Sequence, residues 1–205
     1  MGSELDTNPR KEPRQARSRA TVDAILTATA RVLVEEGYDK ATTNTIARRA
    51  GVSIGSLYQY FPNKEALVTA LCERHMHETM RILMGEIETL QDAPLPEAIR
   101  RLIKVLLRIH AVEPELHRVL IEQVPRLSGF EPVTQIDRVL VDVIRTNLSK
   151  RREKLRPRDL DLAVFILVHG VQGVTHAAVL DRPDALHDEA LASEVTDLIL
   201  RYLVE

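Results

Sequence analysis

The 205-residue chain is poor in cysteine, tryptophan and aromatic side chains of any kind. It has one cysteine, Cys72, and no tryptophan, and aromatic residues make up 3% of it. A lone cysteine cannot build a disulfide framework, so we expect a reducing compartment. Polar residues interrupt the apolar runs, none of which is expected to approach the 18 residues of a membrane span. The polar N-terminus also lacks the apolar core of a secretory signal. We therefore expect a cytoplasmic protein with no membrane partner.

The net charge of −2 conceals an uneven distribution. Residues 1–64 carry ten Lys and Arg against seven Asp and Glu, whereas residues 65–205 carry 18 against 23. A basic N-terminal part indicates an anionic partner there, although a chance fluctuation of surface charge would look the same. Three of the few aromatic residues, Tyr58, Tyr60 and Phe61, lie within four positions. A hydrophobic core would spread such residues out, so this cluster needs a reason.

Hydrophobic periodicity predicts an all-α fold of about nine helices, with no segment alternating at the period of a strand. Gly37 and Gly51 are expected to end the first two helices, and Ser53 to cap the third. The fourth is expected to begin at Lys64, and the apolar segment 159–180 to be buried on more than one side. The other predicted helices comprise 97–110, one starting at Glu113-Pro114, 133–154 and 188–203. We divide the chain into a flexible basic arm (1–15), a first helical domain (16–63) and a second helical domain (64–205).

The stretch 42–64 carries the spacing of a helix-turn-helix. Ala47 is small where the second helix must approach closely, and Gly51, four residues later, can adopt a positive φ in the turn. Six residues further on, Leu57 points back to the core. This arrangement predicts a second helix offered to a DNA major groove. An ordinary αα-hairpin, with Tyr58 and Tyr60 as packing residues, is the alternative.

The outward residues of this stretch suit DNA. Ser and Tyr hydroxyls and helix N-termini bind phosphate, and Gln can read a base edge. The basic residues before the first helix could reach the adjacent minor groove. The candidate DNA-binding residues are Arg14, Arg17, Thr43, Ser53, Ile54, Gly55, Ser56, Tyr58, Gln59, Tyr60 and Lys64.

The block AGVSIGSLYQYFPNKEAL resembles the DNA-binding domain of the TetR family of bacterial transcription regulators almost position for position. The preceding EEGY and ATT also match, and the resemblance is specific over about residues 17–70. It implies phosphate contacts by Thr43, Tyr58, Tyr60 and Lys64. It also implies that Ser53, Gly55, Ser56 and Gln59 face the groove, together with Ile54, where many members carry a polar or basic side chain. Over 71–205 only the helical architecture is shared.

The resemblance further implies that 16–63 is a DNA-binding domain and 64–205 an effector-binding and dimerisation domain. The second would contain a ligand cavity within the fourth to eighth helices and a dimer bundle from the last two. Polar residues His169, Gln172 and His176 recur along the apolar 159–180 segment, either towards a ligand or as interface groups with no ligand role. The candidate ligand residues are Met76, Met80, Met84, His110, His117, Phe165, His169 and Gln172. The candidate dimer residues are Gly173, His176, Leu198 and Tyr202.

Enzymatic and metal chemistry find little support in the sequence. No catalytic Ser/His/Asp set, P-loop or dinucleotide motif occurs, and Cys72 is expected to be a buried small hydrophobe. Glu73 and His77 share a helix face, but no third metal ligand accompanies them. We therefore expect no metal, no cofactor and no enzyme.

The function expected is that of a homodimeric, DNA-binding transcriptional regulator. We expect a repressor that a small-molecule effector releases from an inverted-repeat operator. A cavity with a mostly apolar lining would suit a hydrophobic effector. Two alternatives remain open at this point. One is a helical small-molecule-binding protein or enzyme that keeps the hairpin as scaffold. The other is an architectural or partner-binding protein whose tyrosine cluster meets protein.

Overall fold

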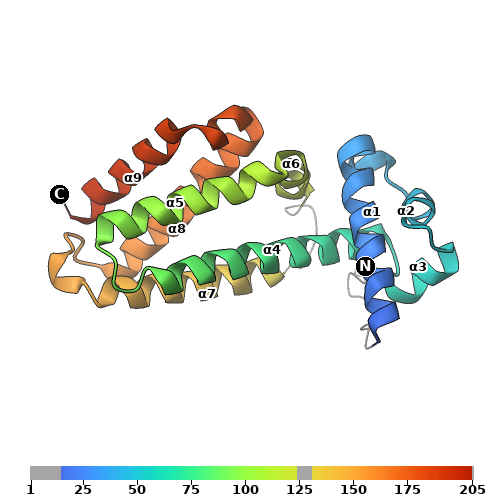
Figure 1. Cartoon of the computed structure of the whole chain (residues 1–205), viewed down its shortest axis with the longest axis horizontal. Coiled ribbons are helices and arrows are strands. Elements are labelled where there is room, and N and C mark those ends of the chain that lie inside the picture. The colour runs from blue at the N-terminus through green and yellow to red at the C-terminus, as the bar shows by residue number, and fades with distance from the viewer. Residues whose placement is uncertain (1–14, 124–130, 205) are drawn as a thin grey trace, which may run out of the picture. The chain divides into compact units, whose positions relative to one another are not determined.

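The computed structural model describes residues 15–123 and 131–204, without the side chains of residues 123 and 131–137. Within these ranges the chain is helical and contains no strand, which confirms the all-α prediction (Figure 1). The helices are α1 (Ala16–Lys40), α2 (Thr43–Ala50), α3 (Ile54–Tyr60), α4 (Lys64–Thr89), α5 (Leu95–Val112), α6 (Pro114–Gln123), α7 (Glu131–Ser149), η2 (Arg152–Lys154), α8 (Leu160–Asp181), η3 (Pro183–His187) and α9 (Glu189–Leu203).

The chain forms two compact units. Unit 1 contains residues 1–76 and 119–130, and unit 2 contains residues 77–118 and 131–205. Both divisions fall inside helices, α4 and α6, so these two helices contribute residues to each unit. Unit 1 extends beyond the boundary expected at residue 63, because the first turns of α4 are buried from Ala66 to Cys72.

In unit 1, α1 packs on α2 and α2 packs on α3. Ile25, Leu33, Ile46 and Leu57 are fully buried and form the centre of this small core. The α1 helix differs from its prediction at its end. Gly37 adopts the positive φ expected of it (φ 76°), but helical structure continues beyond this break to Lys40.

The turn between α2 and α3 follows its sequence closely. The Thr42 hydroxyl accepts the Thr45 N–H at the start of α2, and Gly51 ends that helix with φ 68°. The Gly51 N–H bonds to the Arg48 carbonyl, and the Val52 N–H to the Ala47 carbonyl. These are the two hydrogen bonds of a Schellman motif, which satisfies the last carbonyls of a helix. The left-handed glycine predicted at residue 51 is thus confirmed, and it fixes the direction in which α3 starts.

Cys72 and Asn63 show how α4 is anchored in unit 1. The Asn63 side chain accepts the Ala66 N–H at 2.7 Å and so caps the start of α4. Cys72 is buried, and burial raises the pKa of its thiol to about 12. Such a thiol stays protonated and unreactive at neutral pH, as the sequence predicted.

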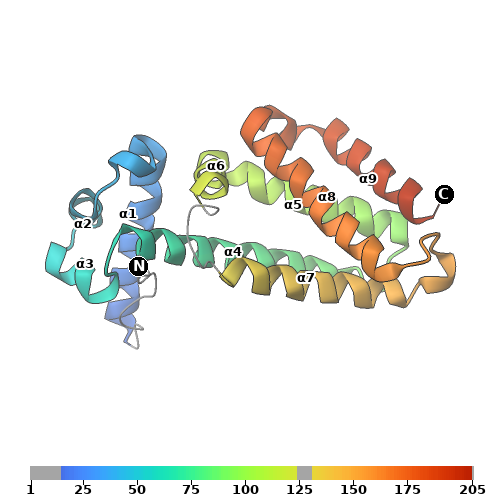
Figure 2. The ribbon, with the colours of Figure 1, turned by 180° about the vertical axis from the view of Figure 1, so that it is seen from behind.

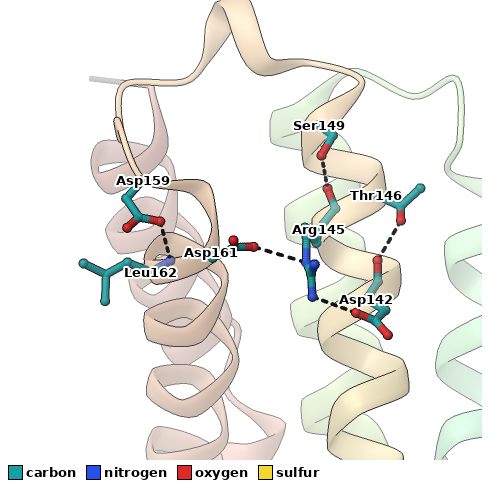
Figure 3. Close-up of polar contacts among 7 residues, drawn as sticks. All are labelled: Asp142, Arg145, Thr146, Ser149, Asp159, Asp161 and Leu162. Carbon is teal, nitrogen blue, oxygen red and sulfur yellow. Dashed lines mark hydrogen bonds and ion pairs between the residues drawn. The ribbon is translucent and has the colours of Figure 1, made fainter.

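In unit 2, α5 packs against α8, α9 and η3, and α7 packs along α8 (Figures 1 and 2). Arg145 of α7 pairs with Asp142 of its own helix at 2.7 Å and links α7 to α8 through Asp161 at 3.3 Å (Figure 3). Asp159 caps α8 by accepting the Leu162 N–H. The end predicted for α7 at residue 154 is wrong. The helix stops at Ser149 and is followed by the separate turn η2.

The α8 helix has one buried and one exposed apolar face within a single chain. The expectation of burial on more than one side is therefore not met in this chain alone. Its exposed large apolar residues are Leu162, Phe165, Ile166 and Val174. By length and composition α8 could also span a membrane, with a mean hydropathy of 1.7, so the expectation that no apolar run is long enough is wrong. Only a third of that apolar window is buried.

Candidate nucleic-acid and effector sites

The α3 helix presents an uncharged polar face. The Ser53 hydroxyl accepts the Ser56 N–H at 3.0 Å and caps the helix, and the two serine hydroxyls bond to each other at 2.8 Å. Gly55 and Gln59 are exposed, as is much of Ile54. A Cβ at Gly55 would meet only the Ser53 hydroxyl, at 3.9 Å. This face is therefore open to a partner, and at Gly55 the partner can approach the backbone.

Thr43 and Tyr58 bring α2 and α3 together at this surface. Their hydroxyls lie 3.1 Å apart, within hydrogen-bond distance, although the residues are 15 positions apart in the chain. The Tyr58 side chain is 41% exposed. Two hydroxyls held this close can both donate to one phosphate, because a phosphate offers several acceptor oxygens.

Lys64 is held inside unit 1 by Tyr38. Its ammonium donates to the Tyr38 carbonyl at 2.8 Å and lies 4.0 Å above the Tyr38 ring. The Tyr38 hydroxyl in turn donates to Glu65 at 3.2 Å. This arrangement joins the end of α1 to the start of α4 and fixes the position of a positive charge there. Its key residue, Tyr38, was not among the predicted site residues.

The remaining predicted DNA contacts are less uniform. Arg17 is exposed on α1, whereas Arg14 lies outside the described residues. Tyr60 is only 9% exposed and Phe61 is 1% exposed. The aromatic cluster therefore divides mainly into one exposed ring, that of Tyr58, and two rings that belong to the core. Any contact of Tyr60 with DNA would involve the small part of it that remains accessible.

Three histidines from three helices meet in unit 2. The ring centroids of His110 (α5) and His117 (α6) are 4.5 Å apart. His176 (α8) lies 6.1 Å from His110. The sequence prediction placed His176 at the dimer interface, but the structure turns its ring towards His110. Beside this histidine cluster, Arg118 donates to the carbonyls of Val179 and Leu180 at the end of α8, a link with no clear sequence signal.

The other predicted effector and dimer residues differ in their exposure. Phe165 is 57% exposed and contacts the ring of His169, which is also exposed. Leu198 is 65% exposed, and a Cβ at Gly173 would meet no atom within 4 Å. The half-buried members of the set are Met76, Met80, Met84, Gln172 and Tyr202.

A surface groove of about 670 Å³ lies in unit 2, and its lining combines charged with apolar side chains. Arg101 and Lys104 of α5 line it and are paired with Glu86 and Glu189. None of the predicted ligand residues lines this groove. Among the described residues no group of three His, Cys, Asp or Glu is arranged to hold a metal ion.

Two family sequence profiles match the chain. The profile of "Bacterial regulatory proteins, tetR family" matches residues 25–71. A second, "Tetracyclin repressor-like, C-terminal domain", matches residues 94–203, which is more than half of the chain. The chain belongs to the TetR family. The helix-turn-helix of unit 1 is thus that of a DNA-binding transcriptional regulator, and this family is not a class of enzymes.

Individual proteins are similar to this chain over most of its length. An HTH-type transcriptional regulator of Mycobacterium tuberculosis is 26% identical over 183 residues, which covers 87% of this chain and 92% of that protein. The match to a crystal structure of a TetR-family regulator from Mesorhizobium loti spans 95% of this chain and 100% of that chain, with a TM-score of 0.72 and 20% identity. SmeT, the repressor of the Stenotrophomonas maltophilia multidrug efflux pump SmeDEF, is 25% identical. The match spans 91% of this chain and 93% of the SmeT chain, with a TM-score of 0.66.

Proposed function

We propose that this TetR-family regulator is a homodimeric repressor, which binds an inverted-repeat operator and leaves it when a small organic effector binds unit 2. The observation that carries the DNA part is the exposed α3 face with the Thr43–Tyr58 hydroxyl pair at its edge. In this proposal Ser53, Ser56 and Gln59 meet base edges and the hydroxyl pair meets phosphate.

Other residues position this face on the duplex. Lys64 adds a fixed positive charge beside the backbone, and Arg17 extends the basic surface along α1. Ile54 offers an apolar contact, which suits a thymine methyl. Gly55 lets the DNA backbone or a base edge approach the start of α3.

The homodimer is supported by apolar surface that this chain leaves uncovered. Phe165 and Ile166 on α8 and Leu198 on α9 are large, apolar and exposed. Gly170 and Gly173 face open space in the single chain, so another helix could approach them. A two-fold dimer presents two recognition helices and so requires half-sites about 34 Å apart, one turn of DNA. This geometry predicts an operator with inverted symmetry.

Effector control follows from helices that serve both units. The α4 helix contributes residues to unit 1 and unit 2, so a ligand that moves it in unit 2 also moves the base of the helix-turn-helix. SmeT supports a small-molecule effector, because a SmeT–triclosan complex covers 91% of this chain at 26% identity and a TM-score of 0.64. To act, the effector must bind the two states with different affinity, by about 1–3 kcal/mol in typical cases.

Footprinting on the DNA upstream of the protein's own gene tests the proposal. We expect protection of two half-sites related by two-fold symmetry, and loss of that protection when Gln59 and Tyr58 are both replaced by Ala. Protection of a single asymmetric site, or none, would refute the operator part. An unchanged footprint for the double variant would refute the assignment to α3.

A further inference from the structure

The histidine cluster of unit 2 places three imidazoles in a mostly apolar interior. His110 and His117 are 8% and 5% exposed, and His176 is half-buried. Two of the helices that carry them, α5 and α8, also bury apolar residues such as Leu107 and Val179. Rings from α5, α6 and α8 therefore meet at one place in unit 2.

Hydrogen bonds fix which ring nitrogen of His110 and His117 carries the proton. The Nδ1 of His110 lies 2.9 Å from the Leu106 carbonyl oxygen, and that of His117 lies 3.0 Å from the Glu113 carbonyl oxygen. A carbonyl oxygen only accepts, so Nδ1–H donates in both. In a neutral imidazole the other nitrogen, Nε2, is then a hydrogen-bond acceptor.

The surroundings keep His110 and His176 neutral. Burial lowers the pKa of His110, and the bond to the Leu106 carbonyl offsets this only in part. Burial also lowers the pKa of His176, and the charge of a protonated His110 lowers it further. No carboxylate contributes to either shift. At neutral pH the Nε2 of His110 therefore offers a lone pair and no proton.

Two of the three histidines, His110 and His176, have ring nitrogens without a hydrogen-bond partner among the described residues. Within residues 15–123 and 131–204, the Nε2 of His110 and both ring nitrogens of His176 make no hydrogen bond. The one fully buried side-chain nitrogen or oxygen found there without a partner is the Thr69 hydroxyl. The unpaired histidine nitrogens are not among such fully buried atoms.

We propose that the histidine cluster is the polar end of the effector site and that it selects an uncharged organic effector bearing a hydroxyl group, of the phenol class. The hydroxyl donates to the Nε2 of His110, and the apolar body of the effector lies among the surrounding aliphatic side chains. This inference rests on the proposed effector control and adds the chemistry that the effector must have.

Charged effectors fit the histidine cluster poorly. A carboxylate only accepts hydrogen bonds, so it would face the Nε2 lone pair unless the imidazole took up a proton, which burial opposes. An ammonium group can donate, but among the described residues no carboxylate contributes to the pKa of His110 or His176, so none is near enough to balance its charge. A neutral hydroxyl satisfies the acceptor and adds no buried charge.

Three probes of the same shape test this selection by calorimetry on the full-length protein. They are 4-tert-butylphenol, its methyl ether 4-tert-butylanisole, and 4-tert-butylbenzoate. We expect the phenol to bind about tenfold or more tightly than the ether, because the ether lacks the donated hydrogen bond. Equal binding of phenol and ether, tighter binding of the benzoate, or no binding of the phenol at millimolar concentration would overturn the proposal.

Nitrogen NMR of the histidine rings gives a readout that a purely structural role would not move. We expect the Nδ1–H tautomer at His110 without a probe, and a shift of its Nε2 resonance with the phenol but not with the ether. The opposite tautomer, or an unmoved Nε2 with the phenol bound, would overturn the proposal.

A pair of matched variants locates the binding. The substitution His110→Phe removes the accepting Nε2 and should abolish the preference for phenol over ether, whereas His187→Phe, at an exposed histidine outside the cluster, should retain it. A preference that survives in His110→Phe, or that is lost in His187→Phe, would contradict the assignment. Binding to DNA is measured separately without any probe. A protein that discriminates phenol from ether but fails to bind DNA would refute the proposed function without contradicting the proposed binding site.

Discussion

Tyr58→Phe should weaken DNA binding strongly without weakening the fold. The change removes one hydroxyl, which lies 3.1 Å from the Thr43 hydroxyl on an exposed side chain. Exposed substitutions usually change stability by about 0.5 kcal/mol or less. A hydrogen bond to a charged acceptor such as phosphate contributes about 1.5–3 kcal/mol.

The dimer makes this contact twice, once in each half-site. The lower value alone then gives about 3 kcal/mol for the complex, which corresponds to about two orders of magnitude in Kd. The loss should be similar on operator and on random DNA, since a phosphate contact carries no sequence information. The dependence of log Kd on log salt should keep its slope, because no positive charge is removed.

Fluorescence anisotropy with labelled duplexes measures Kd, and urea unfolding measures stability in parallel. Thr43→Val should act on the same phosphate, so the double variant should lose less affinity than the two single losses combined. Thr146→Val, at an exposed α7 threonine, is the matched control and should bind DNA normally. A Tyr58→Phe protein that binds DNA within threefold of the parent would refute the phosphate contact, and one that unfolds markedly more easily would show that Tyr58 is a packing residue.

Three further predictions concern the turn, the dimer and the histidine cluster. Gly51→Ala should lower the free energy of unfolding, measured in urea, by about 1–2 kcal/mol because φ is 68°. Gly55→Ala should raise it by up to about 1 kcal/mol and yet weaken DNA binding. Equal effects of the two substitutions on stability would contradict this prediction. Phe165→Glu combined with Leu198→Glu should give monomers in size-exclusion chromatography with light scattering, and an intact dimer would exclude these faces as the interface. Burial holds the pKa of His110 below its ordinary 6.5. Just below pH 6.5, His110 therefore binds a proton in the unfolded chain but not in the folded chain. Stability should therefore fall as pH drops below 6.5, and less so in His110→Phe; a melting temperature with the same pH dependence in both proteins would refute it.

Local signals in the sequence predicted unit 1 well because they act over short distances. Gly51 ends α2 in the left-handed region, and Ser53 caps α3, as a turn and a hydroxyl cap require. Tyr60 shows the limit of such signals. Tyr58 and Tyr60 look equivalent in the sequence. Which of the two side chains is buried depends on the core that the seven-residue α3 packs against, and Tyr60 is the one largely buried there.

Unit 2 was predictable as helices but not as a site. The contact between His110 and His176 joins residues far apart in the chain, and no periodicity within one helix reports it. The same holds for Arg118, which reaches carbonyls about 60 positions away. The apolar length of α8 was visible in the sequence, but which of its faces the chain covers became clear only from the packing of α5 and α7.

The central claim is that this protein recognises a particular DNA sequence through α3. Its most direct test is anisotropy of the purified full-length protein with the duplex upstream of its own gene and with a scrambled duplex of the same composition, at several salt concentrations. The account predicts binding at least about 10³-fold tighter to the upstream duplex at physiological salt, with both affinities falling as salt rises. Equal affinity for the two duplexes across the salt series would contradict it.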